Sequence, residues 1–148
     1  QKAVESAPRV SWSASGYARG LRSFILDRVT AIHAVEFSVY KPGYKFAGTA
    51  DALLDIDGDG PFIVDWKTAK EVRSDDMIEQ FCHQLGAYSL GLQCLTGIKP
   101  KYGAVVVARR SGKPQIKLLN NLELRGAETI FLDRVDRYFK NLDNLAVV

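Results

Sequence analysis

The order of apolar and polar residues along the chain predicts three helices and five strands. Between residues 17 and 29, apolar residues recur at helical spacing and arginines take the other faces. Between residues 35 and 39, apolar and polar residues alternate, which is the period of a half-buried strand. Next we expect strands at 44–56 and 61–68, a helix at 75–95, strands at 102–108 and 115–119, and a helix at 123–142.

This order of elements predicts an α/β fold. Three successive strands, then a helix and further strands, are typical of a mixed sheet flanked by helices. The apolar run at residues 62–64 is expected of a central strand. A length of 148 residues suits one domain, which we expect at 17–148. Residues 1–16, rich in serine, alanine and glycine, are expected to form a loose lead-in.

The charge is unevenly distributed. The net charge is only +3, yet six basic residues and no acidic residue lie between positions 99 and 117. They are Lys99, Lys101, Arg109, Arg110, Lys113 and Lys117. A local positive field of this kind attracts phosphates. A solvated strand and turn is the alternative explanation.

The cysteines and the apolar runs bear on location. Cys82 and Cys94 fall on one predicted helix, where twelve residues separate them by about 18 Å, too far for a disulfide. We therefore expect two buried thiols in a reducing cytoplasm. No apolar run approaches the roughly 20 residues that cross a membrane, and the first residues lack the pattern of a secretory signal.

Two aspartates and a lysine carry the candidate chemistry. Asp65 and Lys67 alternate along a strand, so their side chains share a face roughly 6.6 Å apart. Asp65 directly follows the apolar run, and a buried carboxylate requires a cation. A hairpin would place Asp51 beside it, and Mg²⁺ or Mn²⁺ would relieve the repulsion of the two carboxylates. An ordinary Asp65–Lys67 ion pair, with Asp51 in a turn, is the alternative.

A divalent ion at this position would polarise a phosphodiester and lower the pKa of a bound water. Lys67 would orient that water or stabilise charge on the phosphate. The adjoining residues 55–60 imitate the start of an EF-hand loop, but position twelve is Trp66 rather than glutamate and strands flank the segment. We therefore interpret residues 57–60 as a hairpin turn.

Three short motifs stand in order along this region. They are GTAD at residues 48–51, IVDWKT at residues 63–68 and QLGAY at residues 84–88. Together they resemble the PD-(D/E)XK nuclease superfamily, and within it the RecB-like and mitochondrial genome maintenance exonucleases with their phage relatives. The resemblance implies a restriction-endonuclease-like fold, a central mixed sheet with helices on both faces. It also implies a metal-dependent DNA nuclease, an exonuclease rather than a site-specific enzyme.

The resemblance assigns roles to individual residues. Asp51 and Asp65 match the metal-binding carboxylates, and Lys67 matches the catalytic lysine. The backbone carbonyl of Trp66 is a further expected metal contact. The family often carries a glutamate on the preceding strand, so Glu36 is either a catalytic carboxylate or a plain solvent-facing residue.

The same resemblance gives the expected DNA contacts. Gln84 and Tyr88 match a Q-x-x-x-Y pair that lies beside the active site in relatives, and their i,i+4 spacing puts them on one helix face. Basic side chains would guide the phosphate backbone without reading sequence. The full set of expected DNA contacts is Gln84, Tyr88, Arg19, Arg22, Lys99, Lys101, Arg109, Arg110 and Lys113.

One feature departs from the RecB-like pattern. These exonucleases usually carry an upstream helix whose histidine completes the metal site, and neither His33 nor His83 matches that position. Either such a helix precedes Gln1, or the metal site is reduced.

The resemblance implies work in DNA replication, recombination or repair, with a helicase or recombination protein as a possible partner. Two alternatives stay open. A catalytically inactive DNA-binding module predicts salt-sensitive binding that needs no metal, and a structural ion-pair protein predicts neither binding nor cleavage.

Overall fold

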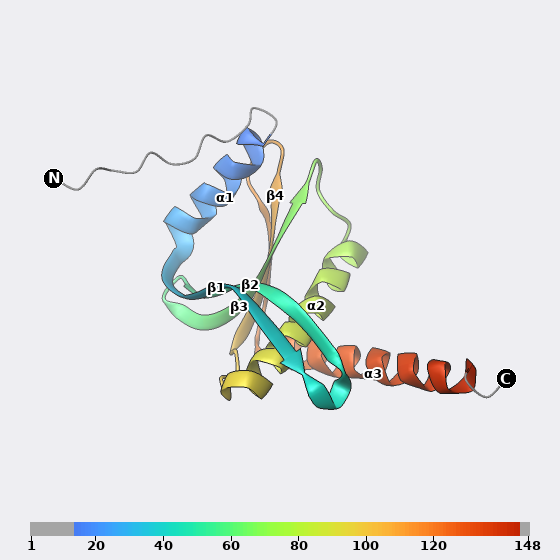
Figure 1. Cartoon of the computed structure of the whole chain (residues 1–148). Helices are drawn as coiled ribbons and strands as arrows, with labels where there is room; N and C mark the ends of the chain where they lie inside the picture. The colour runs from blue at the N-terminus through green and yellow to red at the C-terminus, as the bar shows by residue number, and fades with distance from the viewer. Residues whose placement is uncertain (1–13, 146–148) are drawn as a thin grey trace.

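The computed structural model describes residues 14–145 of the chain. In this part, one five-stranded sheet lies between helices (Figure 1). The elements are α1 (Ser15–Arg28), β1 (Val29–Lys41), the short 3₁₀ turn η1 (Pro42–Tyr44), β2 (Phe46–Ile56), β3 (Asp59–Ala69), α2 (Asp75–Thr96), β4 (Tyr102–Arg109), β5 (Gln115–Leu119) and α3 (Asn121–Leu145).

The strands follow the order of the chain across the sheet. Strands β1, β2 and β3 form an antiparallel meander, β4 runs parallel to β3, and β5 returns antiparallel to β4. A parallel neighbour requires a crossover, and α2 supplies it between β3 and β4. Register shifts near the start of β1 mark bulges, which bend and twist a strand. The predicted mixed sheet is confirmed.

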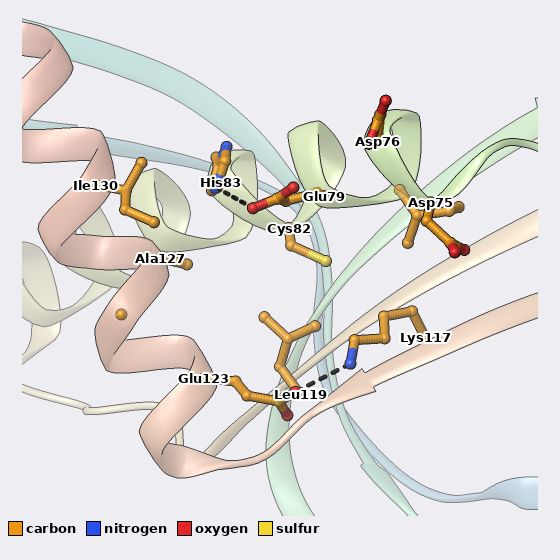
Figure 2. Close-up of a pocket in the computed structure, with 12 residues that line it drawn as sticks. Asp75, Asp76, Glu79, Cys82, His83, Lys117, Leu119, Glu123, Ala127 and Ile130 are labelled. Atoms are coloured by element: carbon orange, nitrogen blue, oxygen red, sulfur yellow. Dashed lines mark hydrogen bonds and ion pairs between the residues drawn. The ribbon is translucent and has the colours of Figure 1, made fainter.

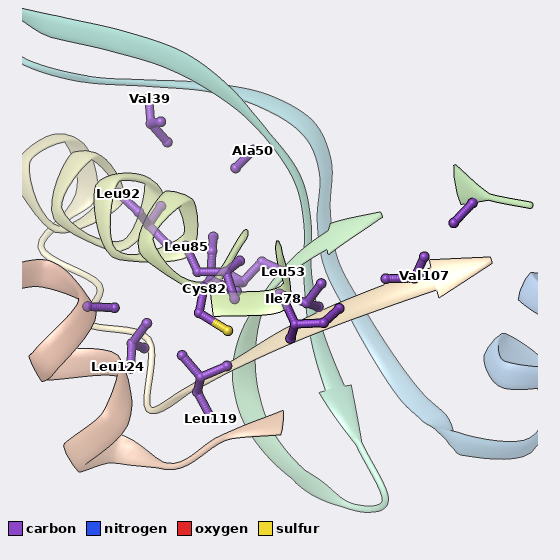
Figure 3. Close-up of a cluster of buried hydrophobic side chains, with 14 residues drawn as sticks. Val39, Ala50, Leu53, Ile78, Cys82, Leu85, Leu92, Val107, Leu119 and Leu124 are labelled. Carbon is purple, nitrogen blue, oxygen red and sulfur yellow. The ribbon is translucent and has the colours of Figure 1, made fainter. Parts of the chain in front are cut away.

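Helices cover both faces of the sheet, as predicted. On one face, Phe24 of α1 packs with buried residues of β2, β3 and β4, including Val64 and Val106. On the other face, Leu85 of α2 packs with Ile63 and other buried residues of the sheet (Figure 3). Helix α3 then packs against the outer side of α2 rather than mainly on the sheet.

Several boundaries differ from the predicted ones. Strand β1 starts at Val29, six residues before the predicted start, because it pairs with β2 as far as Ile56. Tyr44 lies in η1, not in a strand, and Lys45 adopts φ 52°, so β2 begins only at Phe46. Helix α1 begins at Ser15, inside the segment expected to be a lead-in, while residues 1–13 of that segment lie outside the described part.

One expected core position is wrong. Cys82 is buried as predicted, but Cys94 is exposed. The interface of α2 with α3 uses small residues, since a Cβ on Gly86 would lie 2.4 Å from the carbonyl carbon of Ala127, while Ile130 of α3 stays 40% exposed. No helix in the described residues is long and apolar enough to cross a bilayer.

Candidate active site

The meander brings Asp51 and Asp65 together. Ala52 of β2 pairs with Val64 of β3, so the next position along the hairpin sets Asp51 opposite Asp65. The Trp66 backbone N–H donates to Oδ2 of Asp51 at 2.7 Å, which fixes that carboxylate beside β3. The charge of Asp51 also contributes to raising the pKa of Asp65. The predicted side-by-side arrangement is therefore present.

Asp65 is a buried carboxylate with incomplete hydrogen bonding. Its side chain is 2% exposed, and Lys67 Nζ donates to Oδ1 at 3.1 Å. Nζ also forms an ion pair with Oδ2 at 3.0 Å, but Oδ2 accepts no hydrogen bond within the described structure. Burial raises the pKa of Asp65 to about 6 even though Lys67 acts in the opposite direction. One lysine thus leaves this pair of carboxylates only partly neutralised.

Helix α2 covers the site on one face of the sheet. Lys67 Nζ donates to Oε1 of Gln84 at 2.9 Å, and Gln84 Nε2 contacts the Tyr88 hydroxyl at 2.6 Å. Burial, and then the charges of Asp65 and Asp51, raise the pKa of Tyr88. A Cβ at position 48 would lie 3.2 Å from the Tyr88 ring, so Gly48 leaves room for that ring over β2. All three sequence motifs meet at this point.

Phe81 is a site residue that the sequence motifs did not indicate. Lys67 Nζ lies 5.2 Å from the centre of its half-buried ring. A cation held over an aromatic face is stabilised by the ring quadrupole. The signal was available, because Phe81 precedes Gln84 by three residues and therefore shares its helix face.

Trp66 contributes through its backbone, because its indole packs on the opposite face of the sheet, 5.9 Å from the Phe24 ring. The N–H and C=O of a strand residue point to the same side. Since the Trp66 N–H points to Asp51, its carbonyl also points toward β2, beyond the last β2–β3 pair. This position suits the expected carbonyl ligand.

Glu36 lies on the same edge of the site. It stands between Val35 and Phe37, which pair with Ala52 and Ala50, so its position on β1 is opposite Asp51. It is exposed and adopts φ 47°, a conformation that is costly for a residue other than glycine. Strained backbone of this kind tends to cluster at functional sites, so both interpretations of Glu36 stay open.

The profile of the PD-(D/E)XK nuclease superfamily matches residues 5–143. The chain belongs to this superfamily. No curated protein matches the chain significantly. Members of the superfamily are usually nucleases that act on DNA and typically use Mg²⁺ or Mn²⁺.

The possible metal ligands of this PD-(D/E)XK chain fit a Mg²⁺-type ion, although they are few. The described residues contain no cluster of three or more histidine, cysteine, aspartate or glutamate side chains arranged to hold a metal. His33 instead contacts Asp55, with Nε2 and Oδ1 2.9 Å apart. Mg²⁺ is commonly held by one or two carboxylates, with water and substrate phosphate completing its shell. Asp51, and Asp65 with its unsatisfied oxygen, meet that requirement together with the Trp66 carbonyl.

The basic residues between positions 99 and 117 of this superfamily member do not lie together in one patch. Strand β4 separates the two ends of this segment by about 26 Å, because eight strand residues lie between them. At one end, Lys101 pairs with Asp59 at 3.2 Å, and Lys99 is exposed beside it. At the other end, Arg109 donates through Nε to the Lys113 carbonyl at 2.7 Å and so fixes the β4–β5 loop.

The remaining expected DNA contacts lie near α1. Arg19, Arg110 and Lys113 line a hollow of about 580 Å³ between α1 and the β4–β5 loop. Arg22 is exposed on α1, one turn beyond Arg19. Positive charge therefore gathers between α1 and the β4–β5 loop, and not along the whole of β4.

A second hollow, of about 480 Å³, lies between α2, β5 and α3 (Figure 2). Its lining carries four carboxylates, Asp75, Asp76, Glu79 and Glu123, against one lysine. That lysine, Lys117, contacts Glu123 at 3.0 Å. A rim of this charge repels phosphates, so this hollow does not favour DNA.

Proposed function

We propose that the chain is a metal-dependent deoxyribonuclease that hydrolyses phosphodiester bonds at Asp51, Asp65 and Lys67. The observation that carries the proposal is Asp65. It is a buried carboxylate beside a second one, with an oxygen that accepts no hydrogen bond in the described structure and a lysine 3.0 Å away. A structural ion pair would not require Asp51 at the same point.

The side chains divide the work. A divalent cation held by Asp51, Asp65 and the Trp66 carbonyl would polarise the phosphodiester and acidify a water. Lys67 presents its ammonium beside the carboxylates, where it stabilises negative charge that develops on the phosphate. Gln84 holds Nζ of Lys67 at 2.9 Å, which restricts the ammonium to one place.

Around this centre, Gln84 and Tyr88 position the DNA strand, and Glu36 is the further carboxylate nearest Asp51 along β1. The nuclease domain expected at 17–148 also includes Ser15 and Gly16, which belong to α1, and the earlier part of the segment 1–16 is the proposed lead-in. The three motifs at 48–51, 63–68 and 84–88 support a RecB-like exonuclease, of the kind found in mitochondrial genome maintenance exonucleases and phages. Such an enzyme works inside the cell in DNA replication, recombination or repair, with a helicase or recombination protein as partner.

Cleavage of end-labelled linear DNA and of closed circular DNA, single- and double-stranded, tests this function. Each substrate is incubated with Mg²⁺, Mn²⁺ or EDTA. Asp65→Ala and Lys67→Ala proteins run in parallel, and Lys140→Ala on the exposed part of α3 is the control for loss of a lysine. We expect metal-dependent loss of linear DNA, abolished by both site substitutions and retained by Lys140→Ala.

The other outcomes are informative. Cleavage of closed circles would exclude a pure exonuclease while keeping the site. Cleavage that survives Lys67→Ala would remove Lys67 from the chemistry. A folded protein that binds DNA without cleaving it under any metal would indicate the inactive DNA-binding module instead.

A further inference from the structure

The first half of α1 lies directly against the β4–β5 loop. An added Cβ on Gly16 would lie 1.7 Å from the Arg110 carbonyl oxygen, and one on Gly20 would lie 3.5 Å from the Gly112 carbonyl oxygen. Glycines four residues apart share a helix face. This face is therefore shaped to let the loop approach the helix backbone, and the close approach forms the hollow between them.

The hollow gathers positive charge without compensation. Arg19 of α1 meets Arg110 and Lys113 of the loop, and no aspartate or glutamate is among the lining residues. Within the described structure, none of these three side chains forms an ion pair, although the Lys113 backbone is held by Arg109. Three cations brought together repel one another, and an anion would relieve that repulsion.

The helix adds to this preference. The first turn of α1 contains no acidic residue. The N-terminus of a 14-residue helix carries partial positive charge from the aligned peptide dipoles. Together with the three cations, this end of α1 favours a phosphate group.

The hollow lies close to the candidate active site but on the other face of the sheet. Lys67 of β3 pairs with Val107 of β4. Arg110 follows Val107 by three residues, which is roughly 10 Å of extended chain. The Arg110 N–H donates to the Ala69 carbonyl at 3.2 Å, so the loop is tied to the end of β3. Lys67 faces α2, whereas the hollow faces α1. A strand that crosses the carboxyl ends of β3 and β4 reaches both.

We propose that this hollow binds a backbone phosphate of the DNA strand, away from the bond that is cut. The proposal rests on the proposed nuclease function. The hollow then acts as an anchor outside the catalytic centre and holds the strand in place.

The test compares two variants that lose the same charge. Arg110→Gln/Lys113→Gln removes two cations from the hollow, and Arg137→Gln/Lys140→Gln removes two exposed cations from α3. Binding of labelled single-stranded DNA is measured in EDTA at several salt concentrations. Each phosphate contact contributes about 0.7 to the slope of log K against log salt. We expect the hollow variant to lose about 0.7 of slope and the α3 variant to keep the slope of the unmodified protein.

Cleavage kinetics give a second readout. Loss of an anchor that lies away from the reacting atoms should raise KM and leave kcat nearly unchanged. Circular dichroism and melting confirm folding, and Arg19→Gln serves as a single substitution in the hollow if the double variant does not fold. Equal slopes for both double variants, with DNA still cleaved, would overturn the anchor and leave the nuclease function standing. If the unmodified protein does not cleave DNA but the two double variants differ in slope as expected, the anchor stands and the nuclease function is overturned.

Inorganic phosphate distinguishes a nucleic-acid site from a simple anion site. The melting temperature of each protein is measured with increasing phosphate. If phosphate stabilises the unmodified protein but not the hollow variant, while both bind DNA equally, the hollow is a free-anion site and the proposal is wrong.

Discussion

The buried carboxylate of Asp65 destabilises the metal-free protein at neutral pH. Burial raises its pKa to about 6 from an ordinary 3.8. Because the folded pKa is the higher one, the protonated group stabilises the fold. This contribution is fully present below pH 3.8 and is lost as the pH rises through about 6. Asp65→Asn replaces the carboxylate with an amide of the same shape that does not titrate.

The expected magnitude follows from these two pKa values. At about 1.4 kcal/mol for each pH unit, the interval from 3.8 to about 6 corresponds to roughly 3 kcal/mol. Most of it, roughly 2 kcal/mol, falls between pH 4 and pH 7. Any fixed difference between the two side chains, such as the weaker contact of an amide with Lys67, is the same at every pH and cancels from this change.

Urea unfolding of both proteins in EDTA, from pH 4 to pH 8, measures the effect. The free energy of unfolding of Asp65→Asn should gain roughly 2 kcal/mol on that of the unmodified protein between pH 4 and pH 7. A difference that stays constant would show that Lys67 already compensates the burial, and the reasoning would fail. Adding Mg²⁺ at pH 7.5 should then stabilise the unmodified protein, by about 2.7 kcal/mol at a hundredfold excess over Kd, and the variant much less.

Three further predictions concern packing and burial. Gly86→Ala should lower the free energy of unfolding by about 1–3 kcal/mol, because its Cβ would clash with α3. Gly126→Ala, whose Cβ would meet nothing within 4 Å, should raise that free energy by about 0.5–1 kcal/mol. Thermal or urea unfolding of both variants measures the two effects. Cys94 should react with a thiol reagent in the native protein and Cys82 only on unfolding, because burial raises the pKa of Cys82 to about 11; peptide mass spectrometry locates the label. Glu128→Ala should lower the urea midpoint and cost about 3 kcal/mol, because it leaves Arg125 without its buried partner at 2.5 Å; a loss below 1 kcal/mol would contradict this.

The sequence predicted the strands and the centre of the site for a physical reason. Period-two alternation fixes which side chains share a face, so the contact of Asp65 with Lys67 follows from their spacing alone. A tight turn at residues 57–60 fixes the hairpin, and the hairpin sets Asp51 opposite Asp65. Local rules were sufficient wherever neighbouring strands were joined by short turns.

The parts that could not be predicted depend on how separate elements meet. Helical periodicity puts Phe81 on the face of Gln84, but its contact with Lys67 also depends on the angle at which α2 crosses the sheet, which periodicity does not give. The sequence shows a basic segment at 99–117, but it does not show that β4 separates the two ends of this segment by about 26 Å. Arg19 and Arg110 line the same hollow because Gly16 has no side chain that would keep α1 away from the β4–β5 loop. No pattern within a single helix or strand predicts these contacts between separate elements.

Helix α2 connects the fold to the chemistry. One of its faces supplies Gln84 and Phe81 to Lys67, and another packs on α3 through the small residue Gly86. Since a close-packed interface has few alternative arrangements, the contact at Gly86 also fixes the rotation of α2 about its axis. That rotation decides whether Gln84 Oε1 reaches Lys67 Nζ at 2.9 Å. The packing of α3 therefore positions the ammonium from the far side of the helix, although α3 contributes none of the catalytic side chains proposed here.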